Sequence, residues 1–295
     1  MSSASSGRAR SGHLAVREAV ILGALHGPAE LLPISSSGHI AVLPWLLRWD
    51  YAALDGELRK SFEVALHAGT AAALLLTLRH EVRNAVHGLD GRRLSLIALS
   101  FVPPALVGYV LEHPIERRLG TPGTVAAGLA GGAIAMTCAD RMPQERHHDE
   151  AGAVDALWLG LAQACALIPG VSRNGATLAA ARFRRFARED ANRLSRHVAL
   201  PVIAGATVLK GLRIRGRGLE PGTGASFLAG SAASFVSTLG STWLIRQVER
   251  DRSLMPYAVY RLILAALILA RLRGDRAGDS ALRRCLAARS PTMRS

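Results

Sequence analysis

Apolar residues in this chain are gathered into blocks rather than spread evenly. Six of these blocks have roughly the 17–20 residues that an α-helix needs to cross a bilayer. The links between them are short and rich in Arg, Gly and Pro, which is typical of loops between membrane helices. The pattern therefore predicts six membrane spans, at about 61–78, 93–111, 121–138, 195–212, 224–245 and 256–272.

Two further apolar segments, at about 14–47 and 152–186, are interrupted by polar turns. The turn in the first is at residues 35–39, and the turn in the second is at 169–177. A lipid-exposed loop at that depth would leave backbone groups without hydrogen-bond partners, whereas a loop that lines a cavity is tolerated. Each segment is therefore predicted to be a re-entrant helix–loop–helix hairpin.

The order of these elements predicts an inverted repeat. Three spans separate the hairpins, so an odd number of crossings puts the hairpins on opposite sides of the membrane. Broken helices from two such halves meet near the midplane. The predicted fold is an all-α polytopic membrane protein with about six transmembrane helices plus two opposed hairpins. It consists of a disordered tail (1–12), one membrane domain (13–273, with repeats at about 14–138 and 152–272) and a basic tail (274–295).

The net charge of +14, from 36 basic and 22 acidic residues, changes this interpretation little. The arginines stand between the apolar blocks, as expected for loops that face anionic lipid head groups. No aromatic-interleaved basic stretch stands out, so nucleic acid is not expected as a partner. By the crossing count and the positive-inside rule, one set of Arg-rich links shares the cytoplasmic side: 79–93, 139–150, 182–196 and 246–255.

Arg173 is the most informative single residue, because a guanidinium at mid-membrane depth is costly and usually has a functional partner. The helix after its loop is expected to start near Gly175, so the helix N-terminus adds partial positive charge. Hydroxyl and amide side chains flank it. Together they predict a phosphate site formed by Ser172, Arg173, Asn174 and Thr177. An arginine that caps a neighbouring helix is the alternative.

The first polar turn offers reactive groups. His26 and Glu30 are four residues apart and share a helix face, three serines follow at the turn, and His39 opens the next helix. A hydroxyl near a carboxylate and an imidazole can be an activated nucleophile. Alternatively, Glu30 binds a divalent cation that bridges to phosphate. For His39 a capping or packing role is equally expected.

Other polar residues are expected to be structural. Glu18 stands at a helix start and Glu63 begins a span, while His67 lines the cavity or bonds within the bundle. His147 and His148 lie in a charged loop and are expected to be solvated.

Residues 27–39, GPAELLPISSSGH, closely resemble the first signature of the undecaprenyl-diphosphatases, membrane enzymes also known as bacitracin-resistance proteins. Residues 169–177 resemble their second signature. The resemblance continues through 62–70 and 104–108 to 257–261, so it covers nearly the whole chain apart from the tails. Two long signatures in the right order make the resemblance specific.

The resemblance implies hydrolysis of undecaprenyl diphosphate to undecaprenyl phosphate and inorganic phosphate, which recycles the lipid carrier for peptidoglycan synthesis. It also implies a multi-pass homodimer in the bacterial plasma membrane and a divalent cation, Mg²⁺ or Ca²⁺. Carried over by position, the residues that match the family's functional residues are Glu30, Ser36, His39, Ser172, Arg173 and Thr177.

On this resemblance Arg173 holds the phosphates and Ser36 is the favoured nucleophile. Glu30 is then its base or a metal ligand, and His39 is the competing nucleophile or the general acid. Further phosphate contacts are expected from Ser35, Ser37 and Asn174.

Two positions depart from the family pattern. Asn174 stands in place of a serine and can still hydrogen-bond phosphate. His26 stands where the family usually has an acid or glutamine, so it removes a potential metal carboxylate or exchanges one base for another. Two alternatives therefore stay open: a catalytically altered paralogue, and a polyprenyl-phosphate transporter, since transporters also place anion sites between inverted repeats.

Overall fold

The computed structural model describes residues 14–88, 90–217 and 222–288. Within these ranges every regular element is a helix, so the predicted all-α class is confirmed. The predicted tail at 1–12 lies outside the described residues. In chain order the elements are α1 (Val16–Leu31), α2 (Ser36–Leu47), η1 (Asp50–Ala53), α3 (Gly56–Thr77), α4 (Arg79–His87), α5 (Gly91–Leu119), α6 (Pro122–Asp140), η2 (His148–Glu150), α7 (Ala153–Cys165), α8 (Arg173–Phe183), α9 (Arg188–Arg217), α10 (Gly224–Gly240), α11 (Trp243–Arg250) and α12 (Met255–Ala288).

Several helices are long and apolar enough to cross a membrane. Among the described residues these are Gly91–Leu111 of α5, the whole of α6, and Met255–Ala277 of α12. The bent pair α10–α11, with an angle of 50° at its break, also qualifies as one span. The helices α3 and α9 are long as well, but their polar positions leave them outside this set. The apolar helices indicate an integral membrane protein.

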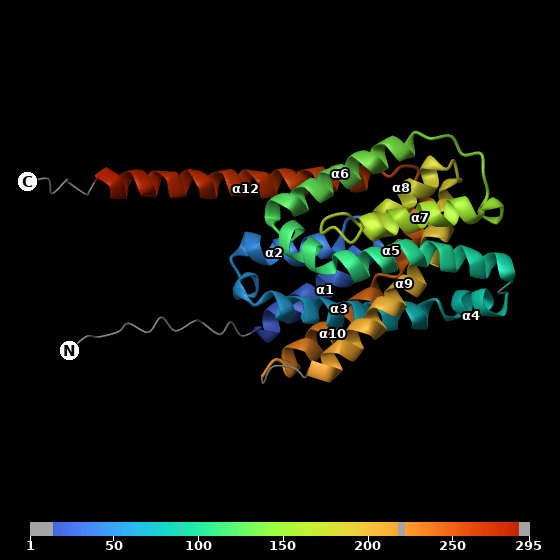
Figure 1. Ribbon diagram of the computed structural model, residues 1–295, viewed down its shortest axis with the longest axis horizontal. Helices are drawn as coiled ribbons and strands as arrows, with labels where there is room; N and C mark the ends of the chain where they lie inside the picture. The colour runs from blue at the N-terminus through green and yellow to red at the C-terminus, as the bar shows by residue number, and fades with distance from the viewer. Residues whose placement is uncertain (1–13, 89, 218–221, 289–295) are drawn as a thin grey trace, which may run out of the picture.

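α5 and α9 extend beyond their predicted spans, and the last two predicted spans differ more strongly. The block 224–245 is interrupted after Gly240, where the Thr242 hydroxyl donates to the Leu239 carbonyl (3.0 Å) and competes with the helical backbone bonds. The block 256–272 is shorter than α12, which extends beyond the bundle as far as Ala288 (Figure 1). Residues 274–288 of the predicted basic tail are thus helical, and an Arg271–Asp275 pair one turn apart supports that continuation (3.7 Å).

Small residues let α1 approach α10 closely. A Cβ added to Gly23 would stand 2.2 Å from the Gly230 carbonyl oxygen, and one on Gly27 would stand 2.3 Å from Ser237 Oγ. Such close backbone contact is typical of helix pairs in membranes. α3 completes this group, with the Phe62 ring 5.5 Å from that of Phe227. These contacts fix the helix that carries Glu30.

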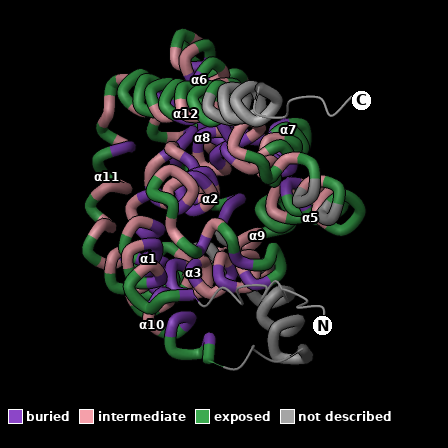
Figure 2. The backbone as a smooth tube through the Cα atoms, turned by 90° about the vertical axis from the view of Figure 1, so that its left-hand side faces the viewer, coloured by how far each residue is buried: buried purple, intermediate pink, exposed green. Residues whose placement is uncertain are grey.

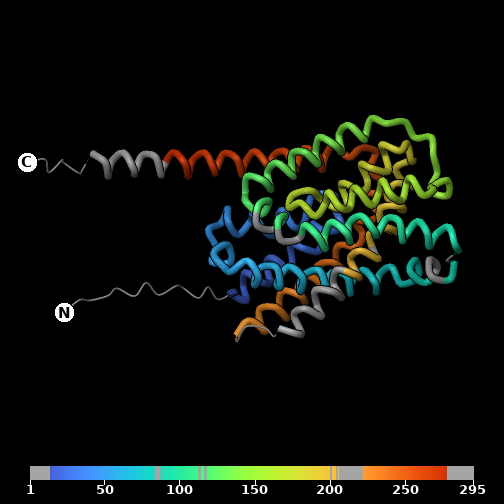
Figure 3. The backbone as a smooth tube through the Cα atoms, in the orientation of Figure 1, coloured from blue at the N-terminus to red at the C-terminus, as the bar shows by residue number. Residues whose placement is uncertain are grey.

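The second interrupted segment is held in a similar way. α7 packs against α5, where a Cβ on Gly160 would lie 2.9 Å from the ring of Pro103, and α8 packs against α6. Although far apart in sequence, the segments α1–α2 and α7–α8 lie beside each other in the middle of the bundle (Figure 3). Buried positions gather there, around α2 and α8, while exposed positions cover the outer sides of α5, α6 and α12 (Figure 2).

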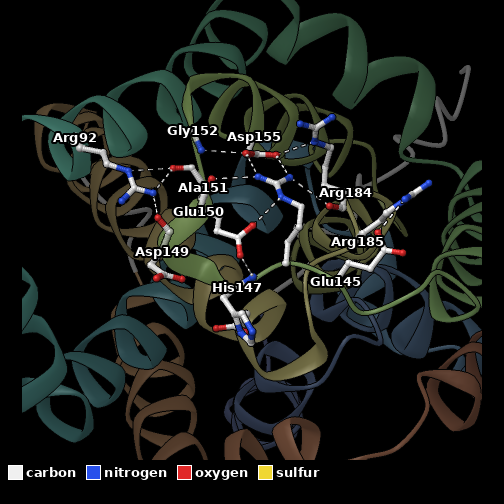
Figure 4. A network of polar contacts seen from close by, with 12 residues as sticks. Arg92, Glu145, His147, Asp149, Glu150, Ala151, Gly152, Asp155, Arg184 and Arg185 are labelled. Carbon is white, nitrogen blue, oxygen red and sulfur yellow. Dashed lines mark hydrogen bonds and ion pairs between the residues drawn. The ribbon is translucent and has the colours of Figure 1, made fainter.

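Arg-rich links meet at one end of the bundle. Asp155, at the start of α7, accepts hydrogen bonds from Arg146 (2.9 Å) and Arg184 (2.7 Å), and Arg92 donates to the Ala151 carbonyl (2.8 Å; Figure 4). Contacts of Arg92 with Asp149, of Arg146 with Arg184 and of Arg196 with Glu81 join the links 79–93, 139–150 and 182–196, which agrees with their predicted place on one side.

The fourth link, 246–255, reaches the same end. Ser253 Oγ donates to Asp140 at the end of α6 (2.6 Å), and Arg188 forms an ion pair with the same carboxylate (2.8 Å). Arg196 pairs with Glu249. All four links thus share one end of the molecule, where ion pairs hold five of their arginines: Arg146, Arg184, Arg185, Arg188 and Arg196.

Asp155→Asn is expected to destabilise the protein by on the order of 2 kcal/mol, because two arginines lose their shared carboxylate. Burial opposes ionisation of Asp155, but hydrogen bonds from two arginines and a backbone amide outweigh it and lower the pKa to about 2. The ionised Asp155 carboxylate therefore stabilises the folded protein fully when the pH is above the unfolded-state pKa of about 3.9. This stabilisation is lost as the pH falls through the folded-state pKa.

Thermal unfolding in detergent checks this expectation. The Tm difference between wild type and Asp155→Asn should be constant from pH 7 to pH 5 and should shrink as pH falls from about 4 to about 2. A difference that persists unchanged to the acid end would show that the carboxylate charge is not what joins these links.

Candidate active site

The loops of the two interrupted segments meet inside the bundle. Arg173, the first residue of α8, forms an ion pair with Glu30 on the last turn of α1 (Nη2–Oε1 2.5 Å). Asn174 Nδ2 donates to the Leu31 carbonyl (2.9 Å), a contact across 143 residues of sequence. The predicted meeting of the two polar turns is therefore present.

The first loop, residues 32–35, turns the chain so that Ser36 faces Glu30. Ser35 has a left-handed backbone (φ 76°), which is uncommon for a residue other than glycine. Its Oγ caps α2 by accepting from the Gly38 amide (3.3 Å), and its carbonyl accepts from His39 Nδ1 (2.7 Å). These bonds offset the backbone strain. Ser36 Oγ then donates to Glu30 Oε2.

The second loop, residues 166–172, brings the N-terminus of α8 to the same place. Gly170 has φ 92°, and a Cβ there would stand 2.3 Å from the Val125 carbonyl oxygen of α6, so only glycine fits. Ser172 caps α8 by accepting from the Gly175 amide (3.1 Å). The first turn of α8 therefore presents Arg173 and the positive end of the helix dipole to the site.

A cavity of about 230 Å³ lies between the two loops and α3. Its lining combines polar residues with apolar ones, among them Val64, Leu167 and Val202. Predicted site residues in its lining are Glu30, Ser35, Ser36, Ser37, Ser172, Arg173 and Asn174. A smaller cavity of about 60 Å³ lies on the other side of the ion pair and is also lined by Glu30, Arg173 and Asn174.

Three predicted residues do not line the larger cavity. His39 uses both ring nitrogens elsewhere: Nδ1 contacts the Ser35 carbonyl, and Nε2 contacts the Tyr260 hydroxyl of α12 (2.6 Å). Thr177 donates to the Arg173 carbonyl (2.9 Å) and so supports the first turn of α8. His26 is buried beside the cavity, with Nδ1 on the Thr70 hydroxyl (2.9 Å).

α3 contributes more to the site than the sequence predicted. Glu63 was expected to be structural and Lys60 was not considered, but both lie in the cavity wall together with His67, for which cavity lining was one of two expectations. His67 packs edge-to-face on His26, with ring centroids 4.5 Å apart, and its Nδ1 lies 4.0 Å from Glu30 Oε2. The available signal was the four-residue spacing of Glu63 and His67, which places both on one face of a helix.

Arg261 is a second residue whose role was missed. It is fully buried in α12, and its guanidinium donates to the carbonyls of Pro33 (3.3 Å) and Gly170 (3.0 Å), one from each loop. A third bond goes to Gly128 of α6 (3.2 Å). Glycine at position 132 makes room for the Arg261 side chain, since a Cβ on Gly132 would stand 2.0 Å from the guanidinium. A lone arginine inside an apolar block was the sequence signal.

Arg261→Met is expected to destabilise the protein by about 3 kcal/mol or more, because buried carbonyls of both loops lose their donor. The measurement is thermal unfolding in detergent, with the exposed Arg273→Met in the same helix as the matched control. A large fall in Tm is expected only for Arg261→Met. Equal Tm values for the two variants would contradict a role in joining the loops.

Comparisons with known proteins agree with the geometry. The profile of the family described as bacitracin resistance protein BacA matches residues 19–267. An undecaprenyl-diphosphatase of Geobacter sulfurreducens is 39% identical over 271 residues, which cover 87% of this chain and 98% of that protein. One of Rubrobacter xylanophilus is 35% identical over 274 residues, covering 88% and 99%. The chain therefore belongs to the bacitracin resistance protein BacA family.

Proposed function

We propose that this protein hydrolyses undecaprenyl diphosphate to undecaprenyl phosphate and inorganic phosphate in the cavity between its two loops. The observation that carries the proposal is the row Ser36–Glu30–Arg173, in which a hydroxyl, a carboxylate and a guanidinium are joined by hydrogen bonds beside that cavity. The apolar residues in the lining suit the start of a polyprenyl chain. The names of the relatives support the substrate and the reaction, and give no support to a transporter.

The substrate's phosphates displace Glu30 as the partner of Arg173. A guanidinium binds phosphate in a bidentate manner, and the N-terminus of α8 adds backbone donors next to it. Glu30 is then released from its ion pair but keeps its bond to Ser36. Phosphate binding and activation of Ser36 are thereby coupled through one carboxylate.

Ser36 Oγ attacks the terminal phosphorus and its proton passes to Glu30. The bond from that phosphorus to the bridging oxygen breaks, and undecaprenyl phosphate leaves. Water then attacks the phosphoserine, Glu30 returns its proton to Ser36 Oγ, and dihydrogen phosphate departs with both protons of the water. Ser36 is favoured over His39 as nucleophile because both ring nitrogens of His39 are engaged away from the cavity.

A divalent cation is part of this proposal. The charged groups in the wall of the larger cavity are Glu30 and Glu63 against Lys60 and Arg173, so their formal charges cancel. A bound diphosphate would leave an excess of negative charge, which a divalent cation, when bound, would neutralise. Glu30 is the ligand nearest to the phosphate site, and His26 and His67 lie close enough to join it. Mg²⁺ and Ca²⁺ stay predictions.

We further infer six spans and two opposed re-entrant hairpins related by an inverted repeat. The packing partners support this inference, because they are preserved when the two halves are exchanged. α1 packs on α10 as α7 packs on α5, and α3 packs on α10 as α9 packs on α5. Helices that are equivalent in the two halves also pack on each other, namely α3 on α9 and α6 on α12. The homodimer and the plasma-membrane location stay predictions.

The test is phosphate release by purified protein in detergent micelles with undecaprenyl diphosphate and a divalent cation. One phosphate per lipid should appear, together with undecaprenyl phosphate. If the relative from Geobacter sulfurreducens releases phosphate under the same conditions and this protein releases none, the hydrolase proposal fails, and a lipid-transfer assay in vesicles becomes the next experiment.

A further inference from the structure

We propose that His26, Glu30 and His67 form a two-histidine, one-carboxylate cation site that prefers a borderline transition ion such as Zn²⁺ to Mg²⁺ or Ca²⁺. The inference deepens the divalent-cation requirement proposed above by naming its ligands and the class of metal. Each residue offers one ligand atom, and these atoms all lie within 4.8 Å of one another. They come from α1 and α3, which other contacts hold together.

The hydrogen bonds around His26 fix which of its nitrogens is available. Ser234 Oγ donates to the Leu66 carbonyl (2.9 Å), so it accepts from the Thr70 hydroxyl (2.8 Å). With its proton directed to Ser234, Thr70 Oγ1 accepts from His26 Nδ1 (2.9 Å). Nε2 is therefore the nitrogen with the lone pair. A hydrogen-bond partner on the other ring nitrogen, which fixes the tautomer in this way, is usual for a ligating histidine.

His26 Nε2 is buried and has no hydrogen-bond partner within the described part of the chain. The whole residue is only 1% exposed, so bulk water does not satisfy that nitrogen. A buried acceptor left unpaired costs about 1–3 kcal/mol. A cation between His26, His67 and Glu30 would remove this cost.

The carboxylate and the second imidazole can adapt to a cation. Glu30 Oε1 faces Arg173, while His67 lies on the side of Oε2. Oε2 accepts a hydrogen bond from Ser36 and still has a lone pair for a cation. Ligand atoms of a tetrahedral zinc site are about 3.3 Å apart for bonds of about 2.0–2.1 Å. The present spacing is wider, so closure requires a movement of His67, which lies in the cavity wall with 36% of its side chain exposed.

The choice of donor atoms sets the metal preference. Imidazole nitrogens suit Zn²⁺ and other first-row transition ions, whereas Mg²⁺ and Ca²⁺ prefer oxygen ligands. An acid at the position of His26 would give two carboxylates four residues apart on one helix face. Such a pair of oxygen ligands favours hard cations such as Mg²⁺ and Ca²⁺. The histidine in this chain changes one of those two ligands from oxygen to nitrogen, and His67 supplies a further nitrogen.

Co²⁺ is the probe that tests the site without reference to turnover. Tag-free protein is stripped with a chelator, titrated with Co²⁺, and followed by its visible d–d absorption. One Co²⁺ per chain should bind, Zn²⁺ should displace it, and a hundredfold excess of Mg²⁺ or Ca²⁺ should not. His26→Gln and His67→Gln should each weaken Co²⁺ binding at least tenfold, and His26→Glu should shift the preference towards Mg²⁺ and Ca²⁺.

Matched controls separate this site from other histidines. His80→Gln on the exposed face of α4 and His148→Gln in the polar loop should both bind Co²⁺ as wild type does. If burial makes His26→Gln unstable, His67→Gln carries the test alone. Unchanged Co²⁺ affinity in His67→Gln, or displacement of Co²⁺ by equimolar Mg²⁺, overturns the inference. Phosphate release without Co²⁺ binding defeats only this site, whereas Co²⁺ binding without phosphate release defeats only the proposed function.

Discussion

Arg173→Ala is expected to lower kcat/KM for undecaprenyl diphosphate by about a thousandfold or more. Arg173 is the charged donor at the N-terminus of α8, and it faces the cavity where the phosphates are proposed to bind. Its loss removes the bidentate contact that strengthens as charge develops on the transferred phosphoryl group. The measurement is the initial rate of phosphate release across a range of lipid concentrations.

The same substitution leaves Glu30 without its ion-pair partner, so a loss of folding must be separated from a loss of catalysis. Arg173→Lys keeps the charge but not the planar pair of donors, and should recover stability better than turnover. Thermal unfolding in detergent reports stability for both variants. Turnover within about tenfold of wild type in Arg173→Ala would remove this residue from the phosphate site.

Ser36→Ala is expected to reduce kcat by at least about a thousandfold, because it removes the proposed nucleophile. Ser37→Ala is the matched control, since Ser37 lines the same cavity and its hydroxyl contacts that of Ser35 (3.4 Å) rather than Glu30. Its loss should stay below about tenfold. Ser35→Ala should mainly lower the Tm, because Ser35 caps α2.

Phosphate release with the three serine variants, each checked for stability, gives the comparison. Small and equal losses would rule out Ser36 as nucleophile and favour water or His39. A Ser36→Ala variant that is inactive but keeps the wild-type Tm would show that the loss is chemical rather than structural.

The two interrupted segments could be predicted because local sequence determines them. Proline, glycine and hydroxyl residues break a helix wherever they cluster, and an apolar surrounding makes such a break conspicuous. The crossing count then required the loops to face each other, and the Glu30–Arg173 ion pair is the contact that this geometry permits. Both steps use only chain order and residue type.

The remaining site residues depend on contacts between distant helices. Arg261 reaches Pro33 across 228 positions, and no local pattern shows that its guanidinium would join the loops. The direction of His39 depends on Tyr260, which α12 places beside it. His67 stands 4.0 Å from Glu30 only because α3 and α1 pack together with α10. Such pairings arise from tertiary packing, which one sequence does not reveal.

A double-mutant cycle on Ser36 and Arg173 tests most directly whether the two loops act on one phosphate. Phosphate release is measured for wild type, Ser36→Ala, Arg173→Ala and the double variant. Groups that act as one unit are strongly non-additive, so the double variant should turn over within about tenfold of the slower single variant. A double variant in which the two losses multiply would mean that Ser36 and Arg173 act independently, and would contradict a single site shared by the two loops.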